Sequence, residues 1–212
     1  MEFQEWPSIS RLRRDMIISE KIDGSNSAVV IARLEDDEEV PDFAVAEIKD
    51  ETQPFDTYYG VFAQSRKRFI TPQDDNFGFA KWVRDNARNL FNVLGEGRHF
   101  GEWWGSGIQR GYGLSKGEKR FSLFNTVRWR DTELPHDLGI YMVPELYVGE
   151  FDTSMIELQK LLLQTNGSTA SPGFMNPEGL VVFHTASRVA FKTTFDECDE
   201  YGFNGGKTWK GQ

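Results

Sequence analysis

Lys21 stands in a short run of residues whose types could support covalent chemistry on a phosphate. The run reads Ser19-Glu20-Lys21-Ile22-Asp23-Gly24-Ser25-Asn26. A protonated lysine amine, with a reference pKa of about 10.4, is a poor nucleophile. It becomes reactive when burial or nearby cations lower that pKa, or when a metal-bound phosphate draws it in. The alternative is a surface lysine in a turn, because so short a motif occurs often by chance.

Four later segments carry groups suited to the same chemistry. In chain order they are Phe100-Gly101-Glu102, Phe121-Ser122-Leu123-Phe124-Asn125, Pro177-Glu178-Gly179-Leu180-Val181-Val182 and Val189-Ala190-Phe191-Lys192. Nucleotidyl transfer depends on positioning and charge neutralisation. One amine, two carboxylates for a divalent ion and one or two cations are enough for it. Each residue alone also has a structural explanation: Glu102 could cap a loop, Phe124 could lie in the core, and Glu178 could be a strand-edge charge.

The ordered series resembles the covalent nucleotidyltransferase superfamily of polynucleotide ligases and RNA capping enzymes. It is most similar to the RNA ligase 2 branch, especially over residues 100–110 and in Lys67-Arg68 followed by Asp75-Asn76-Phe77-Gly78. The resemblance covers roughly residues 19–195. It implies an α+β fold, in which two packed antiparallel sheets flanked by helices form a nucleotidyltransferase domain like the catalytic domains of DNA ligases and capping enzymes. The expected domain spans residues 1–212, without a C-terminal OB-fold or RNA-binding domain.

The resemblance also implies roles for individual residues. Lys21 would attack the α-phosphate of ATP and expel pyrophosphate, and Lys192 would neutralise that phosphate. Glu102 and Glu178 would hold Mg²⁺ or Mn²⁺, ions that suit carboxylate and phosphate oxygens. Phe124 would stack on the adenine. The expected nucleotide-binding set is Glu20, Ile22, Asp23, Asn26, Arg68, Glu102, Phe124 and Lys192.

Two positions depart from the family pattern. Thr194 stands where the last motif usually has a second lysine, which would weaken stabilisation of the transition state unless another cation replaces it. Lys207 and Lys210 are candidates for that replacement. Asn125 stands where this branch usually has an aspartate, so one charge is lost although a hydrogen-bond acceptor remains.

Composition narrows the class of protein. The 212 residues are 39% hydrophobic and 27% charged, which is typical of a soluble domain. The net charge of -9 argues against a dedicated nucleic-acid binder, although basic clusters such as residues 66–68 could still form a local groove. The single cysteine, Cys198, excludes an internal disulfide and a Cys/His metal cage. With no membrane-length apolar run and no signal peptide, we expect a cytoplasmic protein, in the host cytoplasm if its origin is a phage.

The coarse pattern predicts several strands and two helices. Residues 27–34 and 42–48 read as strands that form an antiparallel hairpin around an acidic loop, directly after the Lys21 motif. Residues 79–94 read as one helix ended by Gly95. Residues 99–104 and 120–130 read as further strands. Trp103 and Trp104 could offer stacking faces, but we expect at least one of them in the core.

The second half of the chain continues this mixture. A helix should begin near residues 152–154, with Ser154 and Glu157 at capping-box spacing, and should end at Gly167. Residues 179–184 and 188–193 read as two strands around a short turn, and residues 202–212 as a loose tail. His99 and His184 match no catalytic role.

The leading hypothesis is therefore an ATP-dependent RNA ligase. Lys21 takes AMP from ATP, passes it to an RNA 5′-phosphate, and a 3′-hydroxyl then displaces the AMP. The expected partners are ATP and RNA ends, either nicked duplex or single-stranded, with a protein partner that could supply the grip on RNA, and no membrane. The alternatives are a DNA nick ligase, a GTP-using capping guanylyltransferase, and a catalytically weakened module that binds nucleotides or RNA ends.

Overall fold

The computed structural model describes residues 2–35, 39–53 and 55–195 and divides them into two compact units. Unit 1 comprises the chain up to Ile22 together with the part from Pro144 onward, and unit 2 runs from Asp23 to Val143. No helix of the described residues is long and apolar enough to span a membrane.

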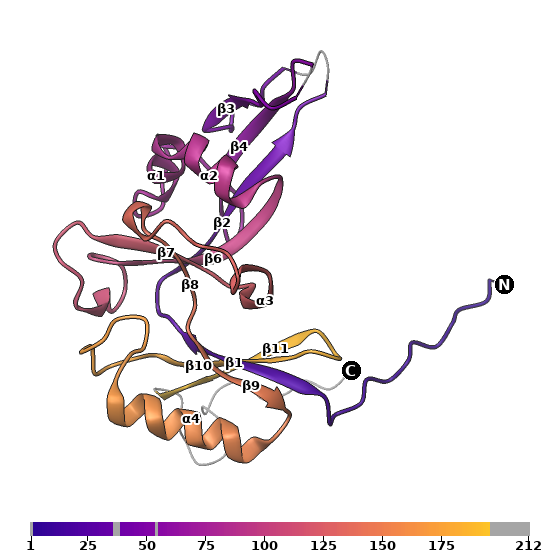
Figure 1. The fold of residues 1–212 in the computed structure, drawn as a ribbon, viewed down its shortest axis with the longest axis vertical. Helices are drawn as coiled ribbons and strands as arrows, with labels where there is room; N and C mark the ends of the chain where they lie inside the picture. The colour runs from indigo at the N-terminus through magenta and orange to yellow at the C-terminus, as the bar shows by residue number, and fades with distance from the viewer. Residues whose placement is uncertain (1, 36–38, 54, 196–212) are drawn as a thin grey trace. The chain divides into compact units, whose positions relative to one another are not determined.

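Unit 1 is a four-stranded antiparallel sheet with one helix on it (Figure 1). Its elements are β1 (Asp15–Lys21), β9 (Glu145–Glu150), α4 (Thr153–Asn166), β10 (Gly179–His184) and β11 (Val189–Thr194), and the strand order is β11-β10-β1-β9. Alternate residues of a strand point to opposite faces of a sheet. Met16 and Ile18 of β1 and Leu180 and Val182 of β10 accordingly form the core against Leu163 of α4.

Unit 2 is built on a larger sheet with the strand order β3-β4-β2-β6-β7-β8, with β5 paired to β4. The pairing is antiparallel except between β7 and β8. Its strands are β2 (Ser25–Arg33), β3 (Ala46–Lys49), β4 (Tyr58–Ser65), β5 (Phe69–Ile70), β6 (Gly97–Gly105), β7 (Lys119–Leu123) and β8 (Ile140–Met142). Its helices are α1 (Phe79–Asp85), α2 (Ala87–Leu94) and α3 (Thr126–Trp129), with the 3-10 turns η1 (Gly111–Gly113) and η2 (His136–Leu138).

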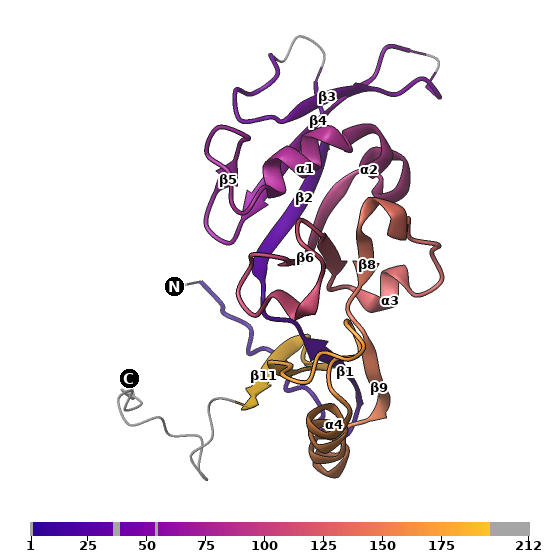
Figure 2. The same ribbon diagram turned by 90° about the vertical axis from the view of Figure 1, so that its left-hand side faces the viewer.

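The central strand of unit 2 is buried on both faces. Val29 and Ile31 of β2 pack in the main core with Phe79 of α1, while Ala28 and Val30 pack on the other face. Figure 2 shows α1 and α2 lying over this sheet. Burial on both faces explains why β2 reads as a continuous apolar run. The α+β class and the strands predicted near β2, β6, β10 and β11 are thus confirmed.

The predicted hairpin between residues 27–34 and 42–48 is wrong. β3 pairs with β4, and β4 occupies the place beside β2. The buried run Gly60, Val61, Phe62 and Ala63 of β4 suits an interior strand, whereas short β3 lies at the edge of the sheet. The place beside β2 is therefore taken by β4, the strand whose residues can be buried on both faces.

Three local predictions also need correction. The helix over residues 79–94 is two helices that meet at Asn86, although it ends at Gly95 as predicted. The strand over residues 120–130 ends at Leu123, and Asn125 then caps α3 by accepting a hydrogen bond from the Arg128 N–H. The cap of α4 is Asp152, which accepts from the Ser154 N–H, rather than Ser154 itself; Gly167 ends that helix as expected.

Candidate functional site

Lys21 is the last residue of β1, not a turn residue ahead of the first strand. Its Nζ lies 2.6 Å from Oε2 of Glu178, the residue just before β10. The two side chains are only 23% and 17% exposed. The pairing of β1 with β10 brings together two residues that are 157 positions apart in the chain. This ion pair holds the lysine amine in a fixed, partly buried position.

The strand register places Lys192 and Thr194 on the same face of the sheet as Lys21. Lys21 is paired with Gly179, and Gly179 with Thr194; two residues along, Ser19 is paired with Val181, and Val181 with Lys192. Residues directly opposite each other in such pairs share a face. Lys192 is therefore two strands away from Lys21, the predicted nucleophile, on the same side of the sheet.

Gly179 fills the middle of this row because no larger residue fits. Its φ is +153°, and a Cβ atom would overlap the carbonyl oxygen of Thr193 and lie 2.8 Å from the Cα atom of Thr194. The close approach of β10 to β11 depends on this glycine. The Thr194 hydroxyl is buried and finds no hydrogen-bond partner in the part of the chain that the structure describes. Lys207 and Lys210, the predicted replacements for a second lysine, lie outside the described residues.

Glu20 points to the opposite face from Lys21, as its neighbour on the strand must. Its buried carboxylate accepts hydrogen bonds from the Ser168 hydroxyl at 2.6 Å and from the backbone N–H groups of Thr169 and Ala170 at 2.8 Å each. Burial raises the pKa of Glu20, and the three hydrogen bonds lower it in part. The Glu20 N–H donates to the carbonyl of Pro144. Both groups of Glu20 thus hold unit 1 together around the strand that carries Lys21.

In unit 2, Asp23 and Gly24 are fixed by side chains of β6 and of the segment that follows it. Arg110 Nε donates to Asp23 Oδ2 at 3.1 Å, and the Asp23 N–H donates to the Tyr112 hydroxyl at 2.8 Å. The Gly24 N–H donates to Glu102 Oε1 at 3.1 Å. A Cβ atom at position 24 would lie 2.6 Å from the carbonyl oxygen of Trp103, so glycine is required there.

The remaining predicted residues occupy different places. Asn26 is paired directly with Glu102 between β2 and β6 and shares its face. Phe124 follows β7 and is 40% exposed, a position from which its ring can contact a ligand. Arg68 lies in the turn between β4 and β5 and makes an ion pair with Asp74 at 2.7 Å. Ile22 of unit 1 is 3% exposed, so its side chain is a core residue.

Several residues that position the site had no role assigned from the sequence, although Arg110 and Asn76 lie in segments that carry the family resemblance. Arg110 and Tyr112 hold Asp23, Asn76 Nδ2 donates to the Ser25 hydroxyl, and the loop from Ser168 receives Glu20. For Tyr112 the sequence does offer an indication, since the residue stands between two glycines. In the structure its φ is +51°, which is uncommon for a non-glycine residue. The others become visible only through contacts between distant segments.

Among the described residues, no three His, Cys, Asp or Glu side chains form a ready metal cluster. Glu178 is bound to Lys21, and Glu102 to the Gly24 N–H. Oxygen donors of this kind nevertheless fit Mg²⁺ or Mn²⁺, which bind through one or two carboxylates and complete their coordination with water and substrate phosphates. The donor chemistry is therefore compatible with a metal that arrives with a nucleotide.

Comparison with solved structures shows that the fold is similar to that of an RNA ligase. A variant of Naegleria gruberi RNA ligase with ATP and Mn matches with a TM-score of 0.53 and 18% identity, over 86% of this chain and 50% of that chain. An apo variant of the same ligase gives 0.52 and 17%, with the same coverage. The structure of that ligase with PPi gives 0.51 and 18%, again over 86% and 50%. The chain thus spans about half the length of the structures it matches, and at these identities the likeness concerns the fold.

Sequence comparisons supply the family. No curated protein sequence matches significantly. The sequence profile described as RNA ligase matches residues 14–195, which include β1, the site residues of both units and β11. The chain therefore belongs to the RNA ligase family.

Proposed function

We propose that this chain is the nucleotidyltransferase domain of an ATP-dependent RNA ligase and that Lys21 is its nucleophile. The observation that carries the proposal is the partly buried ion pair between Lys21 and Glu178, with Lys192 on the same face of the sheet. Family membership supplies the class of reaction, and the Naegleria gruberi ligase with ATP and Mn supplies the cofactors by analogy.

In the first step, the Lys21 amine attacks the α-phosphorus of ATP. A phosphorus–nitrogen bond forms, the bond from the α-phosphorus to the bridging oxygen of the β-phosphate breaks, and pyrophosphate leaves. The amine must lose a proton before or during attack, since only its neutral form has a lone pair to share. Glu178 Oε2, at 2.6 Å, is a base in direct contact with the amine and would orient it until the nucleotide arrives.

A divalent ion, when bound, would neutralise the phosphates and polarise the α-phosphorus. Glu178 and Glu102 are the carboxylates that we assign to it. Lys192 would add a positive charge at the α-phosphate, where charge develops in the transition state. Thr194, whose hydroxyl has no hydrogen-bond partner among the described residues, offers one hydrogen bond where the family pattern offers a second cation.

The groups of unit 2 would bind the nucleoside. Asn26 and Glu102 share one face and can receive the ribose, and exposed Phe124 can stack on the adenine. Asp23 is held in place by Arg110 and Tyr112. Arg68 would contact phosphate only after leaving Asp74, and Glu20 and Ile22 would act through the backbone, because both side chains are buried.

In the following steps, AMP would pass from Lys21 to an RNA 5′-phosphate, and a 3′-hydroxyl would displace it to seal the strand. We expect the protein to act on RNA ends in a cytoplasm, with RNA held by the basic groups of this chain or with the help of a partner protein. These steps rest on membership in the family and on the ATP chemistry proposed for Lys21.

The test is covalent labelling with ATP radiolabelled at the α-phosphate, in the presence of Mg²⁺ or Mn²⁺. Wild-type protein should become labelled and Lys21→Ala should not. Lys160→Ala is the matched control, because Lys160 also lies in unit 1, is 21% exposed, and pairs with a glutamate, Glu157, at 3.4 Å. Absence of label in the wild type across pH and metals would contradict the proposal. Labelling by GTP alone would indicate a capping enzyme, and a chase with nicked DNA instead of RNA would identify a DNA ligase.

A weakened, binding-only module is the second candidate, favoured by the threonine at position 194. Its signature would be tight ATP binding without transfer to Lys21. Introducing the missing charge with Thr194→Lys should then restore labelling, whereas an already active enzyme would gain little from it.

A further inference from the structure

Phe100 lies on the same face of the unit 2 sheet as Glu102, because the two residues are two positions apart on β6. Its carbonyl accepts a hydrogen bond from the Phe124 N–H at 3.0 Å, which continues the antiparallel pairing of Gly101 with Leu123. Phe124 therefore stands opposite Phe100 and shares its face. The two side chains are 44% and 40% exposed, although phenylalanine is among the residues most often buried. Two exposed rings thus lie side by side, next to the carboxylate that we assign to the metal.

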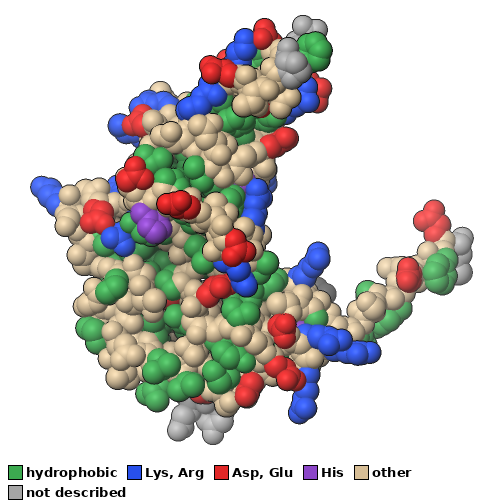
Figure 3. Space-filling view, in the orientation of Figure 1, with side chains coloured by type: hydrophobic (Ala, Val, Ile, Leu, Met, Phe, Trp, Pro, Cys, Tyr) green, Lys and Arg blue, Asp and Glu red, His purple; other side chains and the backbone are tan. Residues whose placement is uncertain are grey.

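The rows of side chains around Phe100 hold little negative charge. Each row runs across the sheet on the Glu102 face, and the strand pairing gives four of them: Phe62, Val30 and Arg98; Gln64, Ala28 and Phe100; Asn26, Glu102, Ser122 and Tyr141; Trp104 and Arg120. Glu102 is the single carboxylate among these described residues. By contrast, basic and acidic side chains are interspersed over the face of the molecule seen in Figure 3.

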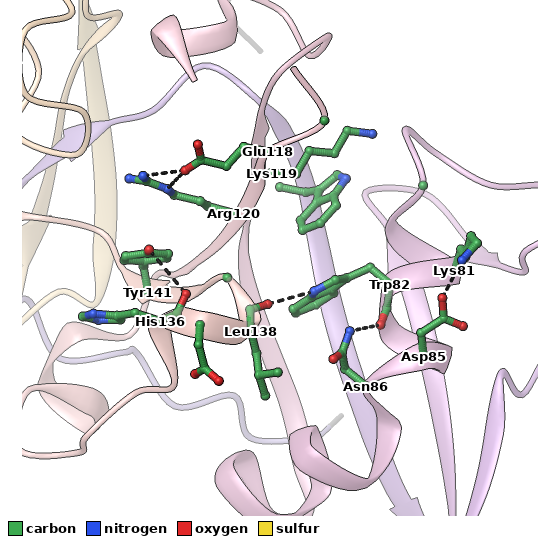
Figure 4. A pocket seen from close by; sticks show the side chains of 15 residues that line it. Lys81, Trp82, Asp85, Asn86, Glu118, Lys119, Arg120, His136, Leu138 and Tyr141 are labelled. Carbon is green, nitrogen blue, oxygen red and sulfur yellow. Dashed lines mark hydrogen bonds and ion pairs between the residues drawn. The ribbon is translucent and has the colours of Figure 1, made fainter. Parts of the chain in front are cut away.

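Arg98 is the cation of this face that no carboxylate neutralises. Arg120, the other arginine of the four rows, is already held, since its Nη2 lies 2.7 Å from Glu118 Oε1 (Figure 4). Its guanidinium also lies 4.8 Å from the centroid of the Tyr141 ring. Arg98 is exposed and makes no ion pair in the part of the chain that the structure describes. Its neighbours in its own row are buried and apolar, so its charge is available to a phosphate.

We propose that Phe100 stacks on the first base of the RNA strand that receives AMP, and that Arg98 binds a backbone phosphate of the same strand. This inference rests on the proposed function, because it takes RNA as the substrate. In the second step, an oxygen of the RNA 5′-phosphate forms a bond to the α-phosphorus. The bond from that phosphorus to the Lys21 nitrogen breaks, and the amine takes up a proton.

The product of this step has two bases to be held. Its 5′–5′ diphosphate joins the adenosine to the first nucleoside of the RNA. Phe124, already assigned to the adenine, provides one stacking ring, and Phe100 beside it provides a second. Bases of single strands stack on aromatic side chains, while cations nearby bind the backbone. Arg98 and Phe100, two residues apart on β6 and on one face, supply a cation and a ring to the same strand.

The test uses a short 5′-adenylylated single-stranded RNA that is blocked at its 3′ end, in a buffer without metal, so that AMP is not transferred. Fluorescence anisotropy at fixed salt gives Kd. Phe100→Leu keeps apolar bulk over Ala28 but removes the ring, and Kd should rise roughly tenfold, the loss expected for one stacked base. Phe55→Leu is the control, because Phe55 is an exposed phenylalanine of the same unit, in the loop between β3 and β4, and its Kd should stay close to that of the wild type.

The same RNA with an abasic first nucleotide identifies the base. Wild type and Phe100→Leu should bind this RNA alike, because there is no first base to stack. A Kd for intact RNA that Phe100→Leu leaves unchanged would overturn the proposal. A tenfold loss that persists with the abasic RNA would overturn it too, since the ring would then act on another part of the strand or on the fold.

The salt dependence of Kd tests the phosphate contact. Each phosphate contact to a single strand contributes about 0.7 to the slope of log Kd against log salt. Arg98→Gln should therefore lower that slope by about 0.7. Arg33→Gln is the control, because Arg33 is also exposed and without an ion pair among the described residues, but alternation along β2 puts it on the opposite face, with Ile31. Equal slopes for the two variants would overturn the role of Arg98.

Failure of this proposal and failure of the proposed function are distinguishable. A wild type that binds the RNA through Phe100 but is never labelled by ATP would overturn the nucleotidyl-transfer mechanism and leave the RNA contact standing. A wild type that is labelled by ATP, but whose RNA binding is unaffected by Phe100→Leu, would overturn only the RNA contact.

Discussion

Replacing Gly179 by alanine should separate β11 from β10 and thereby displace Lys192 from Lys21, the proposed nucleophile. Gly179 links Lys21 and Thr194 across the sheet. The new Cβ atom would overlap the Thr193 carbonyl oxygen and lie 2.8 Å from the Thr194 Cα, whereas ordinary contacts begin near 3.4 Å. Both clashes are with backbone atoms, so no rotation of a side chain can relieve them.

The expected cost has two parts. Alanine at a positive φ costs roughly 1–2 kcal/mol of backbone strain, and overpacking against neighbouring atoms typically costs about 1–3 kcal/mol more. Gly179→Ala should therefore lose roughly 2–5 kcal/mol of local stability. Gly173→Ala is the matched control: it lies in the same unit at a φ of +92°, and its Cβ atom would meet nothing within 4 Å. Only the backbone strain applies to it.

Hydrogen exchange read by mass spectrometry measures this difference, because it reports local opening peptide by peptide. Each 1.4 kcal/mol corresponds to about tenfold faster exchange. Peptides from β10 and β11 should lose protection by roughly 30-fold or more in Gly179→Ala and by clearly less in Gly173→Ala. Labelling of Lys21 by ATP should slow in the first variant and persist in the second. If the two variants show the same hydrogen exchange and the same labelling of Lys21, the close approach of β10 and β11 at Gly179 is not needed for function.

Two further variants test the contacts around the nucleophile. Burial raises the pKa of Glu20 above 4.5, so the folded state holds this proton more tightly than the unfolded chain. The stability of the wild type relative to Glu20→Gln should therefore be highest below about pH 4.5 and should fall as the pH rises through the folded-state pKa of Glu20. Urea unfolding at a series of pH values measures this difference in stability. A relative stability that rises with pH would contradict the prediction. Tyr112→Phe removes the hydroxyl that accepts the hydrogen bond of the Asp23 N–H, which should cost roughly 0.5–1.5 kcal/mol of stability. The variant should also need a higher ATP concentration for half-maximal labelling. An unchanged ATP dependence would show that Asp23 does not need this hydrogen bond.

Local patterns in the sequence account for a good part of this molecule. The apolar run after Asn26 predicts a buried strand, and glycines at 95 and 167 end the helices before them. The ordered motifs indicate the family that the profile match then establishes. These features are readable because each depends on residues close together in the chain.

The tertiary structure decided how those segments meet. Pairing of β4 rather than β3 with β2 depends on which strand can be buried on both faces. Strand alternation turns the carboxylate of Glu20, a residue of the expected nucleotide-binding set, toward the loop from Ser168. Arg110 and Tyr112 lie far from Asp23 in the sequence, and only the folded chain brings them into hydrogen-bond contact with it.

Lys21, the proposed nucleophile, illustrates both sides. The sequence identified Lys21 from its neighbours and from the motifs that follow it, but it could not place Glu178 at 2.6 Å from the amine or Lys192 on the same face. Those relations arise from the register of β1, β10 and β11. The register of β1 against β10 is set by hydrogen bonds and packing between segments more than 150 residues apart, and no local pattern encodes it.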